Sequence, residues 1–233
     1  MLNLKSKKNY ENSNVIKPWG NEYVIYQDKK KIGLTLLKIN PRKETSLHCH
    51  SEKKTGFIIL NIRAKVQIGI YKKNTLTYKP ISRLVFRPGL FHKLINPSNK
   101  KELYILELES PYKKKDVIRF EDKYGRKSKP YEGKNFLQKM SKDNLFFKKP
   151  KQNSQKIYNF KNVKITLKYI NKISQIKKYK KNSTTAILDG SLKNEKGQKI
   201  ISYGEIIKTE TLQVLLKNFK QNKKLLIMQI EKK

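Results

Sequence analysis

The feature that most constrains the fold is a series of short stretches with strand character, separated by residues that favour turns. In the first half of the chain they cover residues 22–27, 33–39, 45–50, 56–62, 65–71, 83–86, 92–95 and 103–109. Similar stretches return later, at 163–170, 184–188, 198–202, 212–218 and 225–230. Short strands at such regular spacing predict an all-β protein, built as a sandwich or a barrel.

The strand pattern predicts two β-rich domains, at residues 1–126 and 160–233. Between them, residues 127–159 are rich in lysine, serine, asparagine and proline, so we expect a linker with one short helix near 135–140. The second half resembles a weak copy of the first. Residues 187–190 align with 59–62, 200–204 with 85–89, and 226–230 with 104–108. Because the second copy has no histidine, it cannot repeat a histidine-based site.

The composition limits the compartment and the partners. A single cysteine excludes an internal disulfide, and residues 1–17 lack the apolar segment of a secretion signal. No apolar stretch is long enough to span a membrane, so we expect a cytoplasmic protein. The net charge of +37 would attract anionic substrates such as sugar phosphates. Only six of the 55 basic residues are arginine, which argues against specific nucleic-acid binding.

The only three histidines, His48, His50 and His92, form a candidate metal site. His48 and His50 stand two apart in a predicted strand, so their side chains share one face while Cys49 points the other way. His92 follows a Pro-Gly turn and begins another strand. Three neutral imidazoles can hold a divalent transition metal, with zinc favoured over iron, manganese or cobalt. The alternative is that they are ordinary core or surface residues.

Three stretches extend the pattern into a family resemblance: Lys-Pro-Trp-Gly-Asn-Glu at 17–22, the histidine motif, and the acidic and basic closing segment, which comprises 106–109 and 116–126. Together they resemble the cupin superfamily, and in particular the isomerase domain at the C-terminal end of bifunctional mannose-1-phosphate guanylyltransferase/mannose-6-phosphate isomerase proteins. The resemblance implies a double-stranded β-helix, or jelly roll, that binds metal inside its barrel. We expect residues 160–233 to form a degenerate second cupin-like domain.

The chain departs from the family where a glutamate ligand usually follows the histidine pair. Lys54 and Thr55 stand there instead, while Ser46 replaces a usual glutamine and Ile62 a usual glycine. Glu52 could reach the metal if the loop after His50 tightens. Otherwise, water or substrate could occupy the metal-ligand position of the missing glutamate.

The resemblance implies interconversion of an aldose phosphate and a ketose phosphate, which needs a proton-transferring group near the sugar. The candidates are Glu107, which matches a family glutamate, and Lys54 and Glu52. Glu107 could equally be an exposed charge, and Lys54 a solvated lysine. Arg119 and Arg126 could bind phosphate or pair with neighbouring acids, and we favour the pairing.

Three functions therefore stay open. The first is a metal-binding cupin of carbohydrate metabolism with isomerase or epimerase chemistry, serving polysaccharide biosynthesis. The second is a three-histidine Fe(II) dioxygenase. The third is a non-catalytic sugar-binding or regulatory cupin. A homodimer is possible in each case.

Overall fold

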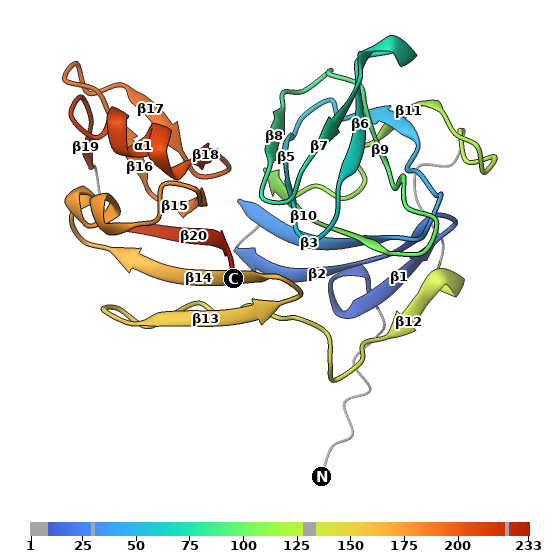
Figure 1. Ribbon diagram of the computed structural model, residues 1–233, viewed down its shortest axis with the longest axis horizontal. Helices are drawn as coiled ribbons and strands as arrows, with labels where there is room; N and C mark the ends of the chain where they lie inside the picture. The colour runs from blue at the N-terminus through green and yellow to red at the C-terminus, as the bar shows by residue number, and fades with distance from the viewer. Residues whose placement is uncertain (1–8, 29–30, 128–133, 222–223) are drawn as a thin grey trace.

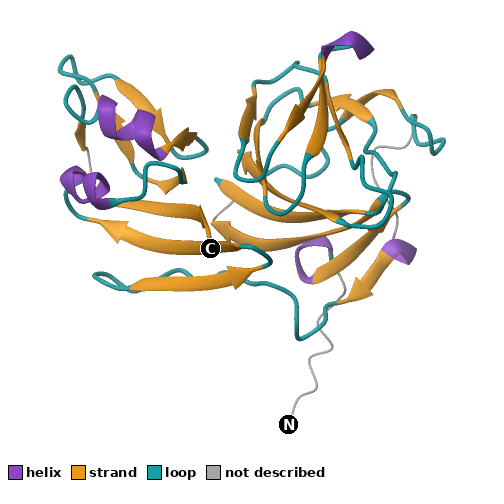
Figure 2. Cartoon of the chain, viewed as in Figure 1, coloured by secondary structure: helices purple, strands orange, loops and turns teal. Residues whose placement is uncertain are grey.

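A computed structural model describes residues 9–28, 31–127, 134–221 and 224–233. Strands dominate these residues, as the sequence predicts (Figures 1 and 2). In the first half, a seven-stranded antiparallel sheet has the order β12 (Leu137–Lys139), β1 (Ser13–Lys17), β2 (Gly20–Asp28), β3 (Ile32–Ile39), β10 (Leu103–Ser110), β5 (Lys54–Ile59) and β8 (Arg83–Phe86). No helix in these ranges is long and apolar enough to cross a membrane.

A smaller sheet faces the large one and closes a barrel. Its order is β11 (Ile118–Glu121), β4 (Leu47–Cys49), β9 (His92–Ile95), β6 (Ala64–Ile68) and β7 (Thr75–Tyr78). Apolar side chains from both sheets, among them Trp19, Phe57, Leu94 and Ile105, form a buried core between the sheets. Three 3₁₀ helices flank the strands: η1 (Tyr10–Asn12), η2 (Lys72–Asn74) and η3 (Lys134–Phe136). This double-sheet arrangement is the predicted cupin jelly roll.

The second half forms two further sheets. The larger has the order β13 (Gln155–Phe160), β14 (Val163–Ile170), β20 (Leu225–Lys232), β15 (Thr184–Asp189) and β18 (Ile206–Lys208). The smaller has the order β17 (Lys199–Ser202), β16 (Ser191–Lys193) and β19 (Lys220–Gln221). The helices η4 (Ile173–Lys178) and α1 (Thr209–Leu215) contribute to a core that includes Ile176, Ile187, Leu212 and Leu225.

The two halves share one strand topology. The order β2-β3-β10-β5-β8 reappears as β13-β14-β20-β15-β18, and β7-β6-β9 reappears as β17-β16-β19. Backbone hydrogen bonds at equivalent positions of the two halves also match. The backbone N–H of Ile59 donates to Ser82 O (3.1 Å), and that of Ile187 donates to Glu205 O (2.9 Å). The second half is therefore a degenerate cupin. Among its described residues no strand corresponds to β4, which carries His48; η4 lies at that point of the chain.

This register tests the three predicted alignments. The equivalence of Ile59 with Ile187 confirms the alignment of 59–62 with 187–190, and the pairing of β20 with β15 confirms that of 104–108 with 226–230. The alignment of 85–89 with 200–204 is wrong, because β17 corresponds to β7 and not to β8.

The two halves pack against each other through equivalent faces (Figure 1). Outward-facing residues of the first large sheet and their register equivalents in the second lie in one buried cluster: Leu34 with Ile165, Leu36 with Leu167, Ile58 with Ala186, Leu60 with Leu188, Leu106 with Met228, and Leu108 with Ile230. The contact is close, since a Cβ at Gly56 would lie 2.4 Å from Cδ1 of Ile206. The arrangement resembles an isologous dimer within one chain.

Two local predictions are wrong. The predicted strand at 212–218 is occupied largely by α1, because Leu212 and Leu216, four residues apart, fall on one helical face and are both buried. The predicted linker at 127–159 contains β12, whose Leu137 pairs with Val15, and most of β13. Near 135–140 the structure has the end of η3 followed by β12 rather than one helix. Residues 128–133 of that segment lie outside the described residues.

Candidate metal centre

The three histidines converge inside the first barrel. His48 lies on β4 and pairs in register with His92 at the start of β9, while His50 directly follows β4. The ring centroids are 4.6–5.3 Å apart, and one ligand nitrogen from each ring lies within 4.8 Å of the others. The sequence pattern thus predicts the convergence that the structure has.

Each ring is oriented by a backbone carbonyl. Nδ1 of His48 bonds Ser46 O (2.8 Å), Nδ1 of His50 bonds Asp116 O (2.5 Å), and Nδ1 of His92 bonds Leu90 O (3.0 Å). A ring that donates from Nδ1 keeps a lone pair on Nε2, the arrangement usual for metal-binding histidines. The Nε2 atoms of His50 and His92 are buried and have no hydrogen-bond partner among the described residues. Because unsatisfied buried acceptors are costly, these nitrogens fit a divalent metal.

The environment keeps the imidazoles neutral. Burial lowers the pKa of all three histidines. The positive charge of Lys53 acts in the same direction on His50, whose pKa is about 3, while the pKa of His92 is about 4. Neutral imidazole is the ligand form, so the site is ready for a metal at neutral pH.

The structure places two of the three predicted catalytic residues elsewhere. Lys54 forms an ion pair with Glu205 of the second half, and the exposed Glu52 pairs with Lys113. Neither lines the barrel cavity. Thr55, at the position of the missing glutamate, is fully buried on β5, and its hydroxyl has no partner among the described residues. No carboxylate from the described residues joins the histidine cluster.

Glu107, the third candidate, lines the cavity together with Glu109, because both point inward from β10. The sequence could not decide which face of this strand is inside. A buried network surrounds them: Lys53 Nζ lies 2.5 Å from Glu109, Lys114 pairs with Glu109, and Lys114 Nζ is 3.5 Å from Glu107. Charged groups remain buried only where they are paired in this way.

The two glutamates titrate differently. Burial and the neighbouring Glu109 carboxylate raise the pKa of Glu107. Burial also acts to raise the pKa of Glu109, but Lys114 and Lys53 outweigh it and hold this pKa at about 2. A pair of carboxyls with separated pKa values is a common way to divide acid–base work. No pattern in the sequence predicts a place in the site for Lys53, Glu109 or Lys114.

Asp116 connects the cavity wall to the histidine motif. Its carboxylate accepts hydrogen bonds from the backbone N–H groups of Ser51 (2.8 Å), Glu52 (3.0 Å) and Lys53 (2.9 Å), and from the Ser51 hydroxyl (2.7 Å). Its backbone carbonyl accepts from His50. Asp116 therefore fixes both the turn after His50 and the His50 ring.

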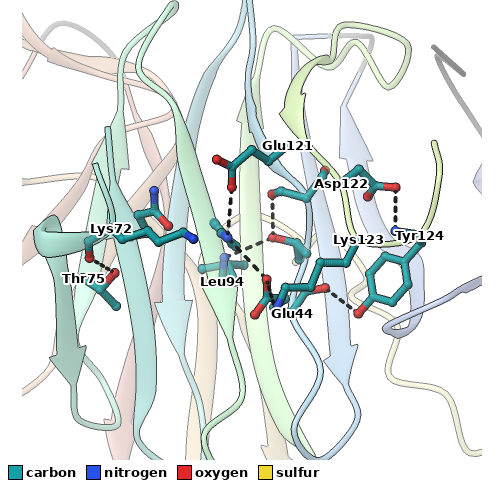
Figure 3. Close-up of polar contacts among 12 residues, drawn as sticks. Glu44, Lys72, Thr75, Leu94, Glu121, Asp122, Lys123 and Tyr124 are labelled. Carbon is teal, nitrogen blue, oxygen red and sulfur yellow. Dashed lines mark hydrogen bonds and ion pairs between the residues drawn. The ribbon is translucent and has the colours of Figure 1, made fainter. Parts of the chain in front are cut away.

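Ion pairs and hydrogen bonds anchor the end of the closing segment (Figure 3). Lys123 Nζ lies 3.2 Å from the Glu44 carboxylate, and the Tyr124 hydroxyl donates to Glu44 O (3.0 Å). Arg126 forms an ion pair with Asp122 (2.6 Å), the pairing that the sequence analysis favoured. Arg126 and Arg119 both line the cavity.

Comparison with known proteins gives a family match. The profile of a family described as mannose-6-phosphate isomerase C-terminal matches residues 5–122. The xanthan biosynthesis protein XanB, from two strains of Xanthomonas campestris pv. campestris, is 29% identical over 118 residues, which are 48% of this chain and 23% of XanB. The chain thus spans about a quarter of the length of these curated relatives.

Solved structures that are similar share little sequence. KdgF from Halomonas sp. is 11% identical with a TM-score of 0.38, covering 42% of this chain and 85% of KdgF. A cupin sugar phosphate isomerase from Silicibacter pomeroyi is 17% identical with a TM-score of 0.31, covering 34% and 50%. The capsular polysaccharide assembling protein CapF from Staphylococcus aureus is 11% identical with a TM-score of 0.39, covering 47% and 34%.

Proposed function

Because the chain belongs to the mannose-6-phosphate isomerase C-terminal family, we propose that it binds one divalent transition metal, zinc first, through His48, His50 and His92 and isomerises a phosphorylated sugar. The observation that carries the proposal is the convergence of three neutral imidazoles beside a cavity that His48, His50 and Glu107 line. Two of the rings, those of His50 and His92, have a buried nitrogen without a hydrogen-bond partner among the described residues. The names of XanB and CapF place both of those proteins in polysaccharide production, and we extend that setting to this chain.

The residues of the cavity have different roles in the proposed isomerisation. A bound divalent ion would polarise the carbonyl and neighbouring hydroxyl oxygens of the sugar. Glu107, whose pKa is raised by burial and by Glu109, moves the proton between the two sugar carbons. Glu109 stays ionised and holds Lys53 and Lys114 in place. The two ammonium groups keep the cavity attractive to an anionic substrate.

Entry of a sugar requires movement of the cavity wall. The cavity has a volume of about 70 Å³, below the range of about 300–1,000 Å³ typical of ligand sites. Residues 111–117 supply Lys114 and Val117 to this wall. We expect this connection between β10 and β11 to open when the substrate binds.

The test compares wild type with His92→Ala and Glu107→Gln, after reconstitution with zinc, manganese, cobalt or ferrous iron. We expect one equivalent of metal in wild type and Glu107→Gln, and none in His92→Ala. Glu107→Gln should lower isomerisation of mannose 6-phosphate by at least about 100-fold, the usual loss for a general acid–base group. Lys54→Gln, outside the cavity, should match wild type. Equal activity of Glu107→Gln and wild type would contradict the role of Glu107.

A second function is favoured by the absence of a carboxylate from the ligand set within the described residues. Three histidines can also hold ferrous iron and leave positions open for oxygen, as a dioxygenase requires. Oxygen consumption with iron but not with zinc, and no isomerisation with any metal, would select this function. Binding of a sugar phosphate without turnover under any metal would instead select a non-catalytic sugar-binding role.

A further inference from the structure

The contact between the two halves differs on its two sides, although the halves pack through equivalent faces. One side is closed by two ion pairs, Lys54 with Glu205 and Lys31 with Asp189 (2.5 Å). By strand register, Glu205 corresponds to Ser82 and Asp189 corresponds to Asn61. On the other side, two neutral polar residues therefore stand where the closed side has its carboxylates.

A groove opens on this second side, with a volume of about 720 Å³. Lys79, Arg83, Lys208 and Lys232 line it, and none of its described lining residues is acidic. Lys208 pairs with Glu210, but Lys79, Arg83 and Lys232 have no carboxylate partner in the ranges that the structure describes. The groove thus brings several cations together without the counter-charges that its counterpart has.

Arg83 is the only arginine among the described residues that line this groove. It begins β8, the edge strand of the large sheet, and its side chain is only partly exposed. Burial lowers the pKa of its guanidinium and no acidic group opposes the shift, although arginine stays charged at neutral pH. A partly desolvated guanidinium without a carboxylate favours an external anion, and its planar fork matches two phosphate oxygens.

The rest of the groove suits a small molecule. Its volume lies within the range of about 300–1,000 Å³ typical of ligand sites. Ser82, Asn162 and Asn182 offer hydroxyl and amide groups that can bond sugar hydroxyls. We propose that this groove is a second ligand site, separate from the histidine cavity, that binds a phosphate-bearing small molecule with Arg83 as the anchor.

The test measures binding of inorganic pyrophosphate to the full chain by isothermal titration calorimetry in 150 mM salt, a condition that screens diffuse surface charge. We expect one saturable site that weakens at least about tenfold in Arg83→Gln, the scale of a lost charge-assisted contact. The matched control is Arg87→Gln, an exposed arginine four residues away that does not line the groove. It should bind like wild type, and so should His92→Ala, which alters only the barrel.

Several results would overturn the proposal. Absence of saturable binding would do so, as would equal weakening in Arg83→Gln and Arg87→Gln, which would indicate nonspecific attraction. Loss of binding in His92→Ala would place the ligand in the histidine cavity. Should Arg83→Gln fail to fold, the double variant Lys79→Gln/Lys232→Gln changes only exposed side chains of the groove. It should weaken binding at least about threefold, and unchanged binding would count against the site.

Discussion

Replacement of Asp116 by asparagine should weaken both the fold and metal binding, although Asp116 is not itself a ligand. The change removes a negative charge that accepts three backbone N–H groups and one hydroxyl from residues 51–53. These residues directly follow His50, and the ring of His50 donates to the carbonyl of Asp116. Loosening this contact should therefore release the His50 ring from its position.

The magnitude follows from the pKa of Asp116. Burial acts to raise it, but the hydrogen bonds from residues 51–53 outweigh burial and lower it from 3.8 to about 2. Each unit corresponds to about 1.4 kcal/mol, which gives an upper value of about 2.5 kcal/mol. Because Asp116 is partly exposed, solvent screening reduces the expected loss of unfolding free energy to about 1–2 kcal/mol. For zinc, loss of an outer-shell contact typically costs about 10–100-fold in affinity.

Urea denaturation of the metal-free protein and zinc titration against a competing chelator measure the two effects separately. The control is Asp143→Asn, since Asp143 is exposed and its carboxylate holds no comparable turn. The contribution of Asp116 to stability should be present above pH 4 and disappear as the pH falls toward about 2, because its pKa is lower in the folded state. Unchanged zinc affinity in a destabilised Asp116→Asn protein would refute the positioning of His50 by Asp116.

Three further predictions follow from the same structure. Lys53→Met should lower the unfolding free energy by about 3 kcal/mol, because it leaves Glu109 buried without that partner. Lys54→Met should lower it by less than about 1 kcal/mol in the same urea experiment. Equal losses in the two variants would contradict the buried network. The metal-free protein should lose stability as the pH falls from about 6.5 to about 3, because the histidines of the unfolded chain then bind protons that buried His50 and His92 do not. In thermal melts, the melting temperature of His92→Ala should depend less on pH than that of wild type. Light scattering should give a monomer of 27.6 kDa, because the second half covers the apolar face of the large sheet, and a dimer that dissociates on dilution would contradict this.

The sequence predicts the histidine cluster and most of the strands because both depend on local patterns. His48 and His50 share a strand face by the two-residue period alone, and β8, β9 and β14 begin and end at the predicted residues. The same two-residue period predicts a strand where α1 lies, because Leu212, Val214 and Leu216 also recur at every second position. In the structure Val214 is exposed, as the helical spacing requires.

The charged lining of the cavity could not be found in the same way. Lysine and arginine make up 55 of the 233 residues, so nothing in the sequence separates buried Lys53 from its neighbour Lys54. Their roles depend on contacts with Glu109 and Glu205, which lie far along the chain. Such pairs are set by the closure of the barrel and by the docking of the second half, which no local period encodes.

Joining two equivalent faces within one chain changes what mutation can do to them. In a symmetric homodimer every substitution at the contact occurs twice, so a carboxylate gained on one side appears on the other as well. Here Glu205 and Ser82, or Asp189 and Asn61, can differ freely although they occupy corresponding places. Two halves fused in one chain can therefore keep the ion pairs on one side of their contact while the residues on the other side change. The contact also persists at low protein concentration, because the halves cannot dissociate.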